Sequence, residues 1–227
     1  MSHHPSNEVL QQYANGSIDA AHGIMIATHL ELCTQCRQKV QYLETRAAEA
    51  LLSQSLPQQM MAASNDDHLN QMFETITALD TLHPSTLRKP ESIEIKVNDR
   101  VVMLPSTLSQ LIRFKGEWRS YGGKVFSAHL DIAEDSRMNL MYINHNVQIP
   151  QHTHKGVEST LVLHGGFSDE DGHYQVGDFI QRDASMKHSP FTKVDEDCLC
   201  LTVLTEPMLF TQGVARVFNL FGKGLYP

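Results

Sequence analysis

Several features of common protein classes are missing from this sequence. Its apolar runs are shorter than the roughly 20 residues that span a bilayer, and no basic segment with an apolar core stands near the N-terminus, so we expect neither a membrane span nor a signal peptide. It has only 18 Lys and Arg against 26 Asp and Glu, and the net charge of −8 argues against an extended phosphate-binding surface. It contains no glycine-rich phosphate loop and no convincing Ser-His-Asp set. These absences favour a cytoplasmic protein with no direct nucleic-acid or membrane partner.

Cysteine is scarce, and the four cysteines form two close pairs. One pair is Cys33 and Cys36, and the other is Cys198 and Cys200. In a reducing compartment, pairs of this kind indicate metal or redox chemistry before a disulfide framework.

The first third of the chain has helical periodicity. We expect a short helix capped by Ser6 and ended by Gly16, a second capped by Ser17 or Asp19, and a third from about Cys33 to Ser55, stopped by Pro57. A fourth helix, capped by Ser64 or Asn65 and closed by His83-Pro84, has an amphipathic stripe of Leu69, Met72, Phe73, Ile76 and Leu79. From the pattern alone, this stripe can equally pack on the first three helices or bind a partner.

The rest of the chain changes to short alternating segments separated by Gly122-Gly123, Gly165-Gly166 and Asp171-Gly172, which we expect to be turns. The strand candidates are residues 93–97, 117–121, 124–130, 137–143, 160–163, 178–181 and 198–204. We therefore predict an α+β multidomain protein: a small helical domain at 1–85, a linker at 86–95, and an antiparallel β-sandwich or barrel at 96–227.

The helical part contains a candidate metal site. His29, Cys33 and Cys36 either share one face of a continuous helix or meet across a turn at Leu32–Cys33, and both arrangements gather zinc-type ligands. His22 lies too far along the helix to share an ion, at about 1.5 Å per residue. His3 or His4 can fold back as the fourth ligand, and we prefer His4 because it adjoins Pro5 and the first helix. The alternative is a redox-active or solvated CxxC pair.

The His29-x3-Cys33-x2-Cys36 motif, among short helices with a histidine upstream, resembles the zinc-binding anti-sigma domain. Residues 9–38 are similar to the N-terminus of ChrR-type anti-sigma factors, which join such a domain to a cupin. The resemblance implies a fourth ligand at His4 and an ECF-type sigma factor held in a 1:1 complex, with the fourth helix clasping it.

A second candidate site lies in the β-rich part. His152 and His154 share one face of a strand, Glu158 follows, and His188 lies on what we expect to be a neighbouring strand, with the first three in one hairpin. The spacing resembles the two cupin motifs, although Asn146 replaces an expected glycine, and Asp183 and Ser185 replace proline and glycine. Three imidazoles and a carboxylate suit Zn²⁺, Fe²⁺, Mn²⁺ or Ni²⁺. A chance cluster of surface histidines is the alternative.

Cys198 and Cys200 also share a strand face. They are either small buried apolar residues, which we slightly favour, or redox reporters near the second site.

Two functions follow from these patterns. The first is an anti-sigma factor with no catalytic residues, which releases its sigma factor when singlet oxygen or an organic hydroperoxide acts on the cupin; this stress signal is implied by the resemblance. The second is a cupin dioxygenase or isomerase with a helical accessory domain. The thiolate-containing cluster favours the first, because an oxygenase has no need of it.

Overall fold

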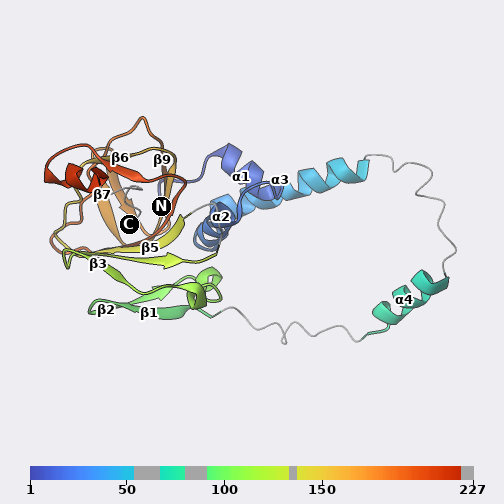
Figure 1. Cartoon of the computed structure of the whole chain (residues 1–227). Helices are drawn as coiled ribbons and strands as arrows, with labels where there is room; N and C mark the ends of the chain where they lie inside the picture. The colour runs from blue at the N-terminus through green and yellow to red at the C-terminus, as the bar shows by residue number, and fades with distance from the viewer. Residues whose placement is uncertain (54–66, 80–90, 133–136, 221–227) are drawn as a thin grey trace.

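A computed structural model describes residues 1–53, 67–79, 91–132 and 137–220. Three helices lie together beside a β-rich domain, and a fourth helix lies apart from both (Figure 1). The predicted fold class, helices followed by an antiparallel cupin-like β domain, is confirmed.

Local signals set the ends of the first three helices, α1 (Asn7–Ala14), α2 (Ala20–Leu32) and α3 (Thr34–Ser53). The Ser6 hydroxyl accepts from the Val9 N–H at 3.2 Å, and Asp19 accepts from the His22 N–H at 3.0 Å, so Asp19 is the cap of α2. These side chains satisfy amide groups that have no partner within their own helix. Their buried apolar residues, including Leu10, Met25 and Val40, belong to one cluster that continues into the β domain.

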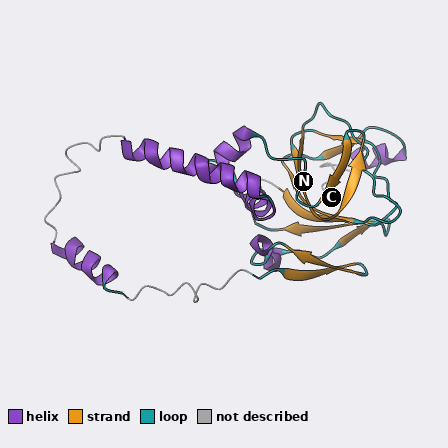
Figure 2. Ribbon diagram, turned by 180° about the vertical axis from the view of Figure 1, so that it is seen from behind, coloured by secondary structure: helices purple, strands orange, loops and turns teal. Residues whose placement is uncertain are grey.

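Helix α4 (Asp67–Thr77) buries none of its residues. The predicted stripe is exposed throughout, with values from 49% at Met72 to 69% at Phe73. The stripe therefore does not pack on the first three helices, which was one of its two interpretations (Figure 2). The predicted stops and caps at Pro57, Ser64, Asn65 and His83-Pro84 lie outside the described residues.

The β domain is antiparallel in every strand pair of the described chain. Its main sheet has the order β3-β4-β5-β10-β7-β8, and β9 also pairs with β7. The strands of this sheet are β3 (Arg119–Tyr121), β4 (Val125–Leu130), β5 (Arg137–Ile143), β7 (Glu158–Asp169), β8 (Gly172–Gln175), β9 (Phe179–Arg182) and β10 (Cys198–Leu204). Two smaller pairs are β1 (Ile93–Val97) with β2 (Arg100–Leu104), and β6 (His152–His154) with β11 (Met208–Phe210). Short 3₁₀ helices η2 (Ser106–Leu108), η3 (Ile112–Phe114) and η4 (Val214–Leu220) complete the described elements.

One predicted turn is wrong. Gly165 and Gly166 lie inside β7, the longest strand, and do not end it. Gly165 has φ +60° and pairs with Cys198, and the register between β7 and β10 shifts close by, between His164 and Val162. Glycine here therefore allows a left-handed backbone beside an irregularity within the strand. The predicted turn at Gly122-Gly123 is present, with positive φ at both residues.

The helical part and the β domain are in contact through α2. The Glu31 carboxylate accepts from the backbone N–H groups of Ser106 and Thr107, both at 2.8 Å, at the start of η2. Residues 91 and 92 of the predicted linker are described and precede β1, residues 86–90 lie outside the described part, and residues 93–95 belong to β1. The proposed domain boundaries stay a prediction. Within the described residues, we find no helix with the length and apolar character needed to cross a membrane.

Two candidate metal sites

The first site lies where α2 passes into α3. Helix α2 ends at Leu32, Cys33 has an extended backbone (φ −117°, ψ 103°), and α3 begins at Thr34. The helix is therefore broken, which is one of the two arrangements that the sequence left open. The break places Cys33 and Cys36 at the start of one helix, opposite His29 at the end of the other.

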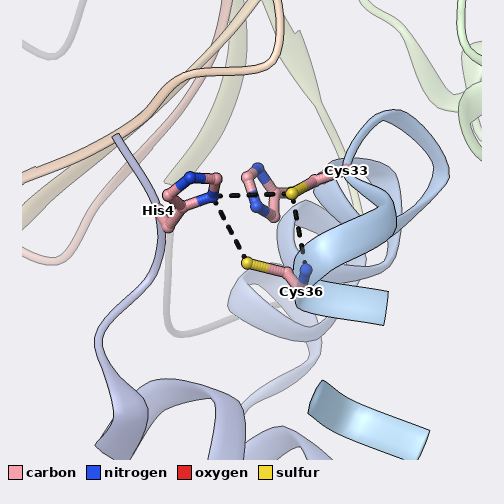
Figure 3. A group of neighbouring side chains, drawn as sticks. His4, Cys33 and Cys36 are labelled. Carbon is pink, nitrogen blue, oxygen red and sulfur yellow. Dashed lines mark hydrogen bonds between the residues drawn. The ribbon is translucent and has the colours of Figure 1, made fainter. Parts of the chain in front are cut away.

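His4 completes this cluster from the N-terminal segment. Its Nδ1 lies 3.5 Å from Cys33 Sγ and 3.4 Å from Cys36 Sγ (Figure 3). One ligand-type atom from each of His4, His29, Cys33 and Cys36 lies within 4.8 Å of the others. The neighbouring His3 instead places its ring against Tyr174, with centroids 4.8 Å apart.

The donor groups of the first cluster fit a metal ion. His29 is fully buried, its Nδ1 contacts the Gly177 carbonyl at 2.9 Å, and its Nε2 is buried without a hydrogen-bond partner in the described part of the chain. A protonated Nδ1 that donates to the carbonyl leaves the Nε2 lone pair available for an ion. Two sulfur and two nitrogen donors suit a tetrahedral zinc site.

Burial also sets the protonation of the first cluster. Burial lowers the pKa of His29, which keeps the ring neutral. Burial, together with the neighbouring Cys33, raises the pKa of the Cys36 thiol to about 12. Without an ion, Cys36 is therefore a thiol at neutral pH, and it must lose its proton to become a metal ligand.

The second site gathers the other four predicted residues. His152 and His154 lie on β6, Glu158 is the first residue of β7, and His188 pairs with His152 through two backbone hydrogen bonds of 3.1 Å. The expected single hairpin is wrong: β6 pairs with β11, whereas β7 pairs with β8, β9 and β10. His188 likewise sits in an isolated bridge and not in a full strand.

The side chains of the second cluster converge closely. Glu158 Oε2 lies 3.1 Å from His154 Nε2 and 3.7 Å from His188 Nε2. One ligand-type atom from each of the four residues lies within 4.8 Å of the others, and all four residues are buried. His152 Nδ1 contacts the Pro150 carbonyl at 2.9 Å, which directs its Nε2 away from the backbone. Three imidazoles and one carboxylate therefore form a set that could hold a divalent ion.

The protonation states of Glu158 and His152 in the second cluster suit such an ion. Burial alone would raise the pKa of Glu158, but the hydrogen bond from His154 and the surrounding imidazoles lower it to about 2. Burial and the neighbouring His188 lower the pKa of His152 to about 4. A carboxylate and a neutral imidazole are the forms that bind metal ions.

A buried charge network lies behind His188. Its Nδ1 is 3.6 Å from Asp169 Oδ2, and Asp169 also pairs with Arg182 and accepts from the Tyr174 hydroxyl at 3.1 Å. Arg182 donates to the Tyr174 oxygen at 2.9 Å. No sequence pattern pointed to these supporting residues, because they lie outside the motif spacing.

The departures from the cupin motifs preserve the local backbone. Asn146 adopts φ +55°, the left-handed conformation that glycine usually provides and that asparagine tolerates. Ser185 donates its backbone N–H to Asp183 Oδ1 at 2.9 Å, which forms a turn without proline or glycine.

A cavity of about 610 Å³ adjoins the second cluster. His152, Glu158 and His188 contribute to its wall, and most of the remaining lining is apolar. Cys200 also lines it, and Cys198 packs beside Cys200 in a small cluster with Phe167 and Tyr174. Sequence patterns gave no signal for this cavity, because its wall comes from strands far apart in the chain.

Comparison with known proteins agrees with this architecture. Residues 117–207 match the ChrR cupin-like domain family. The anti-sigma-E factor ChrR of Cereibacter sphaeroides is 27% identical over 219 residues, which cover 96% of this chain and 97% of that protein. The chain resembles ChrR-type anti-sigma factors along nearly its whole length. The predicted resemblance is confirmed.

A solved structure extends the ChrR similarity to three dimensions. The crystal structure of Rhodobacter sphaeroides SigE in complex with the anti-sigma ChrR matches with a TM-score of 0.67 and 27% identity. The match covers 89% of this chain and 98% of that one. Both ChrR comparisons are with an anti-sigma factor and not with an enzyme, which supports the regulator over the dioxygenase or isomerase.

Proposed function

We propose that this chain is a cytoplasmic anti-sigma factor that holds one ECF-type sigma factor in a 1:1 complex. The main support is that the four-residue cluster in the helical part occurs together with a ChrR-like architecture across both parts. A sigma factor held in this way cannot join RNA polymerase, so transcription from its promoters stays off.

Helix α4 supports this proposal. Four of its apolar side chains, and Leu79 just after its end, are each about half exposed or more. Exposed apolar stripes at helical spacing are typical of helices that enter a partner's groove. Methionine in such a stripe adapts to the partner's surface.

The two metal sites would have different roles. We assign a structural Zn²⁺ to His4, His29, Cys33 and Cys36, where the ion would stabilise a helical unit with a small core. His152, His154, Glu158 and His188 would hold Zn²⁺ or another divalent ion, Fe²⁺, Mn²⁺ or Ni²⁺. The cupin would sense singlet oxygen or an organic hydroperoxide. To release the sigma factor, this signal would have to weaken the binding free energy of the complex by a few kcal/mol.

Co-expression with the cognate ECF-type sigma factor tests the proposal. We expect a 1:1 complex on size-exclusion chromatography, about two metal ions per chain by elemental analysis, and loss of sigma-dependent transcription in vitro. Cys33→Ser and His29→Ala should abolish the complex.

His152→Ala and Glu158→Ala form the matched set for sensing. They should keep the complex and repression, and blunt sigma release after oxidant exposure. Equal loss of repression in both sets would contradict this division of roles. One metal per chain and no sigma complex would contradict the anti-sigma function itself.

A further inference from the structure

The turn between β8 and β9 touches the first metal cluster. Gly177 lies in this turn, and its carbonyl contacts His29 Nδ1 at 2.9 Å. The two residues are 148 positions apart in sequence. Because His29 is fully buried, this carbonyl is a fixed partner for its ring.

The same turn holds the segment that carries His4. The Asp178 carboxylate accepts from the backbone N–H groups of Ser2 and His3, at 2.6 and 3.0 Å from Oδ1. The His3 carbonyl in turn accepts from the Phe179 N–H at 3.0 Å. Asp178 is fully buried, so its end of these contacts is shielded from water. The residue immediately after this anchored segment is His4.

We propose that the Gly177–Asp178 turn of the β domain is a positioning element of the N-terminal metal site. It orients two of the four ligands, His29 directly and His4 through the anchored segment. The inference rests on the proposed metal at this cluster. In this proposal, the β domain also sets the rate at which the N-terminal cluster releases its ion.

Two physical effects carry this control. The Gly177 carbonyl selects the His29 tautomer with a proton on Nδ1, which leaves Nε2 free to bind the ion. The Asp178 carboxylate removes much of the freedom of a chain end, so His4 loses less conformational entropy when it binds the ion. Without these contacts, α2 and α3 would still hold His29, Cys33 and Cys36, but the His29 ring would lose its fixed orientation and His4 its anchor.

A series of contacts also links the anchored N-terminal segment to the second cluster. Tyr174, on β8, contacts the His3 ring at 4.8 Å and donates from its hydroxyl to Asp169 at 3.1 Å. Asp169 lies 3.6 Å from the Nδ1 of His188. A rearrangement at the second cluster therefore has a continuous set of contacts through which it reaches the first.

The test follows release of Co²⁺ from the full chain after addition of excess EDTA. Thiolate-to-cobalt charge-transfer absorption reports only the first cluster, because the second contains no cysteine. We expect Asp178→Ala to release this Co²⁺ about 10 to 100 times faster, the usual range for loss of a supporting contact. Asp178→Asn keeps an oxygen acceptor and should restore much of the difference.

Asp197→Ala is the matched control. Asp197 is also a buried carboxylate of the β domain, but it pairs with Tyr142, Arg100 and His164, away from the N-terminal segment. This variant should release Co²⁺ within about twofold of the unmodified chain. Any general weakening of the β domain would instead accelerate both variants alike, and that result would overturn the proposal.

A second pair of variants leaves the β domain untouched. His3→Pro removes the N–H that donates to Asp178, whereas His3→Ala keeps it. The proline variant should accelerate release and the alanine variant should change it much less. This pair decides the question if Asp178→Ala fails to fold.

A normal charge-transfer band with unchanged release in Asp178→Ala and His3→Pro would overturn only the role of the turn. Absence of the band in the unmodified chain would overturn the metal assignment and this proposal with it.

Discussion

The Sγ atoms of Cys198 and Cys200 lie 3.3 Å apart on one face of β10, and both residues are buried. Their mutual contact and burial raise the pKa of Cys198 well above its ordinary value. Since the thiolate is the reactive form, we expect iodoacetamide to modify this pair very slowly in the folded protein and completely in denaturant. Mass spectrometry of the digested protein measures both. Labelling at the rate of an exposed thiol would contradict the buried placement.

Binding of Zn²⁺ at the first cluster should release protons. Burial raises the pKa of Cys36 to about 12, so its thiol is protonated at neutral pH until an ion displaces the proton. We expect proton release when Zn²⁺ is added to the metal-free chain, seen as a dependence of the calorimetric heat on buffer ionisation enthalpy. Cys36→Ser should release fewer protons and bind more weakly. Equal proton release by the two proteins would contradict the assignment.

Shortening the Phe73 side chain on α4 should weaken binding of the sigma factor and leave the stability of the protein unchanged. Phe73 is 69% exposed, so Phe73→Ala should change the free energy of unfolding by less than about 0.5 kcal/mol. If the stripe enters a groove of the sigma factor, the same change should weaken the complex about tenfold or more. Gln71→Ala, on the opposite face of α4, is the control and should bind normally. Fluorescence anisotropy with labelled sigma factor measures the difference.

Acid should destabilise the metal-free β domain. The pKa of His152 is lowered from its ordinary 6.5 to about 4, so below pH 6.5 the unfolded chain takes up a proton that the folded chain does not. Stability is therefore full above pH 6.5 and falls as pH drops toward 4, by roughly 3 kcal/mol from this residue. Glu158, lowered to about 2, adds a further loss below about pH 4.5.

Urea unfolding of the metal-free chain at pH 7, 5.5 and 4.5 measures this dependence. The His152→Gln variant should lose less stability over the same interval, because glutamine does not titrate. Parallel pH profiles for the two proteins would show that His152 is not the cause.

Removal of Asp169 should affect both stability and the second metal site. Arg182 is buried and pairs with Asp169, so Asp169→Ala leaves a poorly compensated charge at a cost of about 3 kcal/mol. It also removes the carboxylate next to His188 and should weaken metal binding about tenfold or more. Asp171→Ala is the matched control: that side chain is 55% exposed, so its pair with Arg182 should contribute less than about 1 kcal/mol. Equal losses in the two variants would contradict the role given to Asp169.

The sequence by itself determined several helix caps and strand bounds and the residue types of both clusters. Ser6 caps its helix as expected, and Asp19 is one of the two caps expected for the next helix, because a cap depends on a few neighbouring amides. The predicted bounds of β5 and β10 agree with the structure, since alternation and turn residues act at short range. The spacing of His152, His154 and Glu158 likewise named the group that the structure brings together.

Only the tertiary structure decided the relations between distant segments. The break at Cys33, the position of Gly165 inside β7 and the pairing of β6 with β11 were not settled by local pattern. These features depend on which strands and helices pack together, and packing is a collective property of the chain. For the same reason, no sequence spacing predicted the contact of His29 with Gly177, which joins the first metal cluster to the β domain.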